Sequence, residues 1–212
     1  MQTVKDLDDL VRLVSAGEVV AFETDTVPAL AAKAFIETAR LKIAHLKGRS
    51  ASQKMQVLVD GDILSQIILP SITPPAKSIF QKLADAFWPG ALTIVAPSHL
   101  DGATLGVRYP NHAGVLEILK HTGALWATSA NLSGGIPARG LNQVQAIFGD
   151  SVHYYLSPED DIQTEMKPNQ IASTVVQIAP PGLGADIGVS SAEQVKILRH
   201  GSISESQILS AL

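Results

Sequence analysis

Residues 124–135, with the sequence ALWATSANLSGG, join a predicted strand to a polar turn. Ala124 to Thr128 carries no charge and is mostly apolar, which is typical of a short strand buried inside a sheet. Ser129 to Gly135 follows directly and has the small, polar composition of a turn. Ligands of open α/β sheets bind where strands end in such turns. The stretch therefore predicts an α/β fold with a candidate site at the end of this strand.

The same arrangement occurs near the N-terminus. Val19 to Phe22 is a predicted strand, and the polar Thr24, Asp25 and Thr26 come soon after it. Along the rest of the chain, strand-like runs alternate with helical periodicity and no sequence repeat is present, so we expect one mixed, twisted sheet with flanking helices. The other predicted strands are Met55–Val59, Ala91–Ala96, Leu105–Tyr109, Val152–Leu156, Thr174–Ile178 and Val195–Arg199, and the predicted helices are Val4–Val14, Thr38–Leu46, Pro74–Phe87, Val115–Lys120, Leu141–Phe148 and Ser204–Leu212.

The composition predicts one domain over residues 1–212. With 212 residues and 46% hydrophobic residues, the chain is long enough for one substantial core and short for two. No apolar run approaches the roughly 20 residues of a membrane span, and no secretion signal precedes the first helix. The chain contains no Cys, which excludes disulfides and thiolate chemistry. We therefore expect a soluble, cytoplasmic protein that contacts no membrane.

The charge is unevenly distributed. The net charge of -4 argues against indiscriminate nucleic-acid binding. The segment Thr38–Val59, however, contains Arg40, Lys42, Lys47, Arg49 and Lys54 and no acidic residue. Such a segment can form a local anion site on an acidic protein.

The familiar catalytic signatures are missing from the sequence. No segment fits a conventional phosphate loop or a G-x-S-x-G elbow, and the six His residues show no i, i+4 pair, so no metal site is predicted. What remains is a set of polar clusters at the ends of predicted elements. Each cluster alone also fits an ordinary structural role: a capped turn at Thr24–Thr26, cations at a helix C-terminus for Lys47 and Arg49, and a simple turn at Ser129–Gly135.

Taken together and in order, the clusters resemble the YrdC-like threonylcarbamoyl-AMP synthase family from about Gly17 to about Ile203. Seven blocks carry the resemblance, among them paired Lys-x-Arg and Ser-x-Asn elements that the family uses at its active site. The blocks are Thr24–Val27, Lys47–Arg49, Trp88–Thr93, Val107–His112, Thr128–Gly134, Ser173–Val176 and Ile197–Gly201. The resemblance implies a single α/β domain with a large open cleft.

The resemblance also implies an enzymatic function. A member of this family would condense L-threonine, bicarbonate and ATP, the last with Mg²⁺, into threonylcarbamoyl-AMP and release pyrophosphate. The product would serve tRNA modification together with other proteins that act downstream, and affinity for tRNA or double-stranded RNA is implied as well. Because the threonine carboxylate, a carbamate and the triphosphate are all negative, the reaction needs fixed cations and neutral donors that screen them.

The family's roles can be carried over residue by residue. Lys47 and Arg49 would contact the phosphates and the developing charge, and Ser129 and Asn131 would be the facing hydrogen-bond donors. Five further residues would bind substrate: Thr24 and Thr26 on the threonine side, Arg108 and Ser173 as additional contacts, and Arg199 at a nucleotide phosphate or the ribose.

Several positions depart from the family pattern and leave alternatives open. Pro28 and Ala29 replace a usual Tyr-Gly pair, Ala172 replaces a proline, and Gln177 replaces an acid. These changes bear on catalytic activity and make a second hypothesis necessary, a divergent non-catalytic paralogue that binds double-stranded RNA or nucleotide through the same cationic cleft. A third hypothesis, the carbamoyl-transferring domain of a larger maturation enzyme, is disfavoured by the length and by the lack of Cys.

Overall fold

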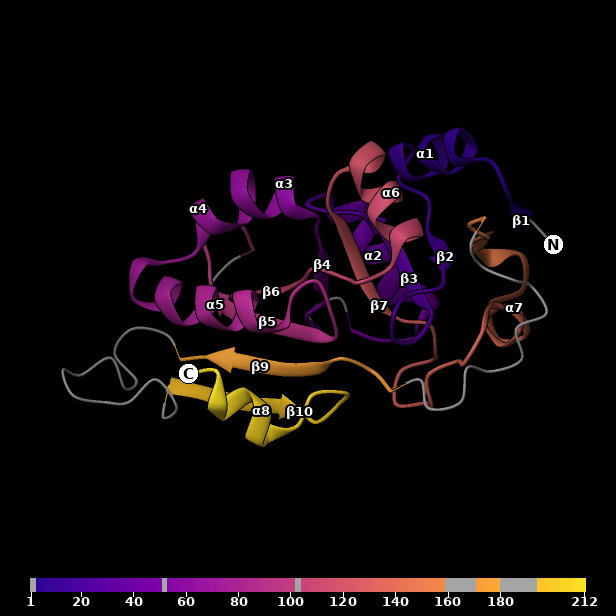
Figure 1. Ribbon diagram of the computed structural model, residues 1–212. Coiled ribbons are helices and arrows are strands. Elements are labelled where there is room, and N and C mark those ends of the chain that lie inside the picture. The colour runs from indigo at the N-terminus through magenta and orange to yellow at the C-terminus, as the bar shows by residue number, and fades with distance from the viewer. Residues whose placement is uncertain (1–2, 51–52, 102–103, 159–170, 180–193) are drawn as a thin grey trace.

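The computed structural model describes residues 3–50, 53–101, 104–158, 171–179 and 194–212. These residues form one ten-stranded sheet with helices packed against it (Figure 1). The strand order is β1-β8-β2-β3-β7-β4-β6-β5-β9-β10. The strands are β1 (Thr3–Val4), β2 (Val20–Phe22), β3 (Ala29–Lys33), β4 (Gln56–Leu58), β5 (Leu92–Pro97), β6 (Thr104–Arg108), β7 (Leu125–Ser129), β8 (His153–Tyr155), β9 (Thr174–Ile178) and β10 (Val195–Arg199).

The sheet is mixed, as the sequence predicts. Strands β2, β3, β7 and β4 pair antiparallel in that order, whereas β4 pairs parallel with β6 and β5 pairs parallel with β9. The chain therefore crosses the sheet several times and brings segments that are distant in sequence into one layer. Figure 1 shows β9 and β10 with helix α8 (Glu205–Ser210) beneath β5 and β6.

The helices pack on this sheet at several places. Helix α5 lies against β5 and β9, α2 lies against β3, and α1 contacts both α6 and the strands β2 and β3. The helical segments are α1 (Leu7–Ser15), α2 (Glu37–Leu46), α3 (Gly61–Ile63), a π-helical turn (Leu64–Ile68), α4 (Leu69–Ser71), α5 (Pro74–Phe87), α6 (Ala113–Thr122), α7 (Leu141–Phe148), a 3₁₀ turn (Gly149–Ser151) and α8 (Glu205–Ser210). None of the helices in the described part of the chain is both long and apolar enough to cross a membrane.

Short-range hydrogen bonds explain where several helices begin. The Asp6 carboxylate accepts hydrogen bonds from the backbone of Asp8 and Asp9 and so caps α1. Ser204 and Gln207 form the reciprocal capping box that their spacing predicts, at the start of α8. These residues satisfy backbone donors that have no partner inside the helix.

One face of the sheet is closed by the core and the other remains open. In β5, Leu92, Ile94 and Ala96 are fully buried on the core side. Thr93 and Val95 alternate with them and line a pocket on the opposite face. Alternation along a strand thus separates the apolar core from the surface that carries the candidate site.

Most predicted elements are present, and three differences stand out. Strand β3 was not expected, because its sequence ALAAK lacks the β-branched and aromatic residues that mark strands. The short β1 and the helical residues 61–71 were not expected either. The acidic composition of Ser157–Asn169 predicts a loop-like excursion there, and residues 159–169 lie outside the described part of the chain.

Gly201 is predicted to be required for the fold of the C-terminal segment. A Cβ atom at this position would lie 2.3 Å from the Ala172 carbonyl oxygen and 2.5 Å from the Thr174 nitrogen. Because these are backbone atoms, Gly201→Ala should destabilise the chain by about 1–3 kcal/mol, lowering the Tm by roughly 2–12 °C. Thermal unfolding should show the loss. The control is Gly61→Ala, whose added Cβ would make only an ordinary contact of 3.5 Å with Tyr109. Equal Tm values for the two variants would contradict this account.

Candidate active site

A cleft of about 380 Å³ lies on the open face of the sheet. Its floor consists of side chains from adjacent strands, and its walls are the segments that follow α2 and β7 and precede β9. All nine predicted site residues line this cleft, although they come from distant parts of the chain: Thr24, Thr26, Lys47, Arg49, Arg108, Ser129, Asn131, Ser173 and Arg199.

Lys47 lies at the C-terminus of α2 and is almost fully buried. Its ammonium group donates hydrogen bonds to the carbonyl oxygens of Ser129 at 2.5 Å and Asn131 at 2.6 Å, and lies 3.4 Å from Asn131 Oδ1. Burial, with a smaller contribution from the Arg49 charge, lowers the pKa of Lys47 to about 8. At neutral pH the group is still mostly charged, which suits its oxygen acceptors. Lys47 thus binds the turn after β7 directly, rather than facing it across the cleft.

The Ser129–Gly135 turn is held by its own side chains. Ser129 Oγ donates to Asn131 Oδ1 at 2.6 Å, and Asn131 Nδ2 donates to the carbonyl oxygens of Leu132 at 2.7 Å and Gly135 at 2.9 Å. The donor protons predicted to face the ligand are therefore directed into the turn in this structure. These bonds give the turn one defined shape at the wall of the cleft.

Arg49 has unused hydrogen-bonding capacity in the cleft. Its Nε and Nη2 atoms are buried, and neither has a hydrogen-bond partner within the described part of the chain. Burial lowers the pKa of Arg49, and the nearby charge of Arg40 lowers it further. A guanidinium that is removed from water without a partner is costly, so the arrangement fits an anionic ligand that supplies the missing acceptors.

Arg108 organises the Thr24–Thr26 turn after β2. Its guanidinium donates to Thr26 Oγ1 and to Asp25 Oδ1, both at 2.7 Å, and to the Gly90 carbonyl oxygen at 3.1 Å. Burial lowers the pKa of Arg108, and the ion pair with Asp25 opposes that shift. Thr24 Oγ1 in turn donates to the Val27 carbonyl oxygen at 2.8 Å and lies 3.1 Å from Thr26 Oγ1. The predicted threonine side of the cleft is therefore rigidly hydrogen-bonded.

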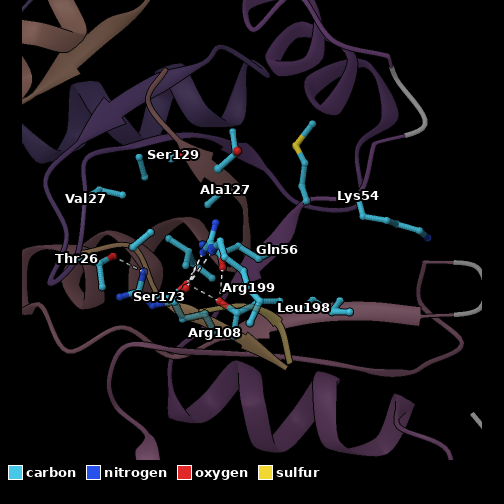
Figure 2. Close-up of a pocket in the computed structure, with 18 of the residues that line it drawn as sticks. Thr26, Val27, Lys54, Gln56, Arg108, Ala127, Ser129, Ser173, Leu198 and Arg199 are labelled. Atoms are coloured by element: carbon cyan, nitrogen blue, oxygen red, sulfur yellow. Dashed lines mark hydrogen bonds between the residues drawn. The ribbon is translucent and has the colours of Figure 1, made fainter. Parts of the chain in front are cut away.

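Arg199 and Ser173 form a pair on the opposite side. Arg199 donates from Nε and Nη2 to the Ser173 carbonyl oxygen at 3.1 and 2.8 Å, and from Nη2 to Ser173 Oγ at 3.0 Å. Figure 2 shows this pair close to Arg108 and Gln56, with Lys54 pointing away from them. Bonds on one edge of the guanidinium leave Nη1 of Arg199 without a partner among the described residues.

Gln56 and Thr93 are among the cleft residues that sequence reasoning missed. Both line the cleft, and Thr93 Oγ1 donates to Gln56 Oε1 at 2.6 Å and lies 2.9 Å from Ser173 Oγ. The available signal was the alternation of a polar residue with buried apolar residues in a predicted strand, which marks a side chain on the opposite face of the sheet. That signal does not reveal which strands are neighbours, so the contact itself could not be foreseen.

The departures from the family pattern occupy different places. Ala29 and Ala172 line the cleft, whereas Pro28 is buried and its carbonyl oxygen accepts a hydrogen bond from the Ala130 nitrogen at 2.9 Å. Gln177 lies in β9 opposite Val95 of β5. None of these substitutions removes one of the charged groups described above.

Comparisons with known proteins agree with this geometry. A family model of Sua5, YciO and YrdC proteins, described as "Telomere recombination", matches residues 12–201. A Mycobacterium tuberculosis protein is 30% identical over 219 residues, which cover 100% of this chain and 91% of that protein. A Nitrosococcus oceani protein named threonylcarbamoyl-AMP synthase is 32% identical over 156 residues, covering 68% of this chain and 81% of that protein.

A solved structure shares the fold. The crystal structure of P. abyssi Sua5 complexed with L-threonine superposes with a TM-score of 0.78 at 23% identity, covering 99% of this chain. This chain spans 60% of the length of that Sua5 chain. Since the family match extends over most of the sequence and through every block that lines the cleft, this chain belongs to the Sua5/YciO/YrdC family.

Proposed function

We propose that this chain is an L-threonylcarbamoyl-AMP synthase, which condenses L-threonine, bicarbonate and ATP and releases pyrophosphate. The observation that carries the proposal is the unpartnered, buried guanidinium edge of Arg49 in a cleft that also contains Lys47, Arg108 and Arg199. A set of fixed cations around one cavity is what a triphosphate and two carboxylates require in order to approach each other. The names of the relatives support the same reaction.

The chemistry assigns separate tasks to the two sides of the cleft. The amino nitrogen of threonine forms a bond to the carbon of bicarbonate, with loss of water, and gives a carbamate. A carbamate oxygen then attacks the α-phosphorus of ATP, the bond between the α- and β-phosphates breaks, and pyrophosphate leaves with the electron pair. Arg49 and Arg199 would bind the anionic oxygens during this displacement. The turn held by Arg108 would position threonine through the oxygens of Thr24 and Thr26.

Mg²⁺ enters this proposal only as the counterion that accompanies ATP. Within the described residues, no group of three or more His, Asp or Glu side chains is placed to hold a metal ion. tRNA, as the final acceptor of the threonylcarbamoyl group, remains part of the proposal as the substrate of downstream proteins.

The direct test is product formation. Purified chain incubated with ATP, Mg²⁺, bicarbonate and L-threonine should release pyrophosphate and form threonylcarbamoyl-AMP, with release dependent on threonine. Pyrophosphate assay and mass spectrometry of the nucleotide provide the measurement. Binding of ATP or RNA without any threonine-dependent release would instead support the non-catalytic paralogue.

Arg49→Ala should weaken ATP binding by about 10- to 150-fold, because a lost charge-assisted hydrogen bond costs about 1.5–3 kcal/mol. Titration calorimetry with ATP provides the measurement. Arg12→Ala is the matched control, since Arg12 is exposed and pairs only with Asp9 on α1. If both variants bind ATP as tightly as the unchanged chain, Arg49 is not a ligand residue.

ATP affinity should fall as pH rises through about 8. Lys47 has a pKa lowered to about 8, so above this pH it loses its charge and one of the protons that hold the Ser129–Gly135 turn. Calorimetry from pH 7.5 to 9.5 avoids titration of the ATP phosphates. In Lys47→Arg, whose guanidinium stays charged over this range, the pH dependence should disappear. A constant affinity of the unchanged chain across the range would contradict the assignment.

A further inference from the structure

A one-directional chain of hydrogen bonds crosses the floor of the cleft. Thr93 donates its single hydroxyl proton to Gln56 Oε1 at 2.6 Å, so the contact of 2.9 Å with Ser173 must use the proton of Ser173. Ser173 Oγ then accepts from Arg199 Nη2 at 3.0 Å. The bonds therefore lead from Arg199 through two hydroxyls to the amide oxygen of Gln56. Figure 2 shows Gln56, Ser173 and Arg199 together in the middle of the pocket.

Gly106 lies beside Gln56 on the floor of the cleft. Gln56 is in β4 and Thr93 is in β5, and β6 lies between them. In β6, Gly106 pairs with Gln56 on one side and with Val95 on the other. Paired residues project to the same face, and a Cβ at Gly106 would make only ordinary contacts of 3.6 Å with Gln56 Cα, the Met55 carbonyl oxygen and Val95 Cγ2. Glycine adds no side chain to this part of the floor, and the Gln56 side chain reaches across β6 to Thr93.

The amide nitrogen of Gln56 is left for a ligand. The bond to Thr93 fixes the orientation of the amide through its oxygen, and among the described residues no hydrogen-bond acceptor is found for Nε2. Because Gln56 lines the cleft, its amide offers two neutral N–H donors there. Next to Arg199, such donors add hydrogen bonds to an anion without adding charge that would repel the neighbouring guanidinium groups.

We propose that Gln56 is a substrate-binding residue whose Nε2 donates to an anionic oxygen held beside Arg199, and that Thr93 is the positioning residue that orients it. The inference rests on the proposed function. The anionic oxygen belongs to a carboxylate or carbamate of threonine or to a phosphate of ATP. These sources share the same chemistry and are separated by measuring the two substrates individually.

The sharpest variant is Gln56→Glu. It keeps an oxygen that can accept from Thr93 but replaces the donor that faces the cleft with a second, negatively charged oxygen. Affinity for the substrate that contacts this position should fall at least tenfold, as expected for the loss of a charge-assisted hydrogen bond. Gln53→Glu is the matched control, because it makes the same change at an exposed position three residues away and should change affinity less than twofold.

The measurement is calorimetry with ATP alone and with L-threonine in the presence of a non-hydrolysable ATP analogue. A loss confined to ATP identifies a phosphate contact, and a loss confined to threonine identifies a carboxylate contact. If Gln56→Glu lowers the Tm, Gln56→Met replaces it in the test, since it keeps the side-chain length and adds no charge. Unchanged affinity for both ligands in a folded Gln56 variant overturns the inference.

Thr93 provides an independent readout. Thr93→Val keeps the shape of the side chain but removes the hydroxyl. It should therefore weaken binding of the same substrate that Gln56→Glu affects, and Thr93→Ser should restore that binding. A merely structural role of Thr93 would lower the Tm without this selective loss and rescue. Failure of the proposed function is a separate result, because it would show as a lack of threonine-dependent pyrophosphate release by the unchanged chain. A loss of affinity that occurs only in the variants is therefore distinct from a failure of the proposed function.

Discussion

The hydrogen bonds between the Lys47 ammonium group and the carbonyl oxygens of Ser129 and Asn131 are the contacts on which the cleft depends. They join the end of α2 to the turn after β7, and the Ser133 nitrogen returns a bond of 3.0 Å to the Lys47 carbonyl oxygen. A buried charge is tolerated only with such partners. The carbonyl oxygens of the turn therefore hold the Lys47 ammonium group in place, and the ammonium group holds the turn. Arg49, two residues further along, is placed at the cleft by the same anchor.

The cleft itself results from small residues on one face of the central strands. Ala29, Ala127 and Gly106 lie on β3, β7 and β6, where larger side chains would fill the space. The opposite face of the same strands carries large buried residues such as Leu30, Val107 and Leu105, which stabilise the sheet by removing apolar surface from water. One set of strands thus serves both stability and ligand access, because successive side chains point to opposite faces.

The sequence predicted the elements better than their arrangement. Strands β9 and β10 and helix α7 were predicted with the bounds found, since their apolar patterns are clear. Strand β3 was missed, because an alanine-rich run has no distinctive period. The nine site residues were identified through ordered blocks that resemble a family, and the fold brings them to one cleft. The link from Gln56 to Thr93 was beyond reach, since it depends on a strand order that periodicity does not encode.

The cations of the cleft divide into two groups with different physical tasks. Lys47 and Arg108 use most of their protons on the protein, so they set the shape of the site. Arg49 and Arg199 retain donors that no described residue satisfies, so they are the groups available to an anion. Donors that are oriented before a ligand arrives need no reorganisation on binding. Ala29 lies on the floor of the cleft, and all four cations line the same cleft.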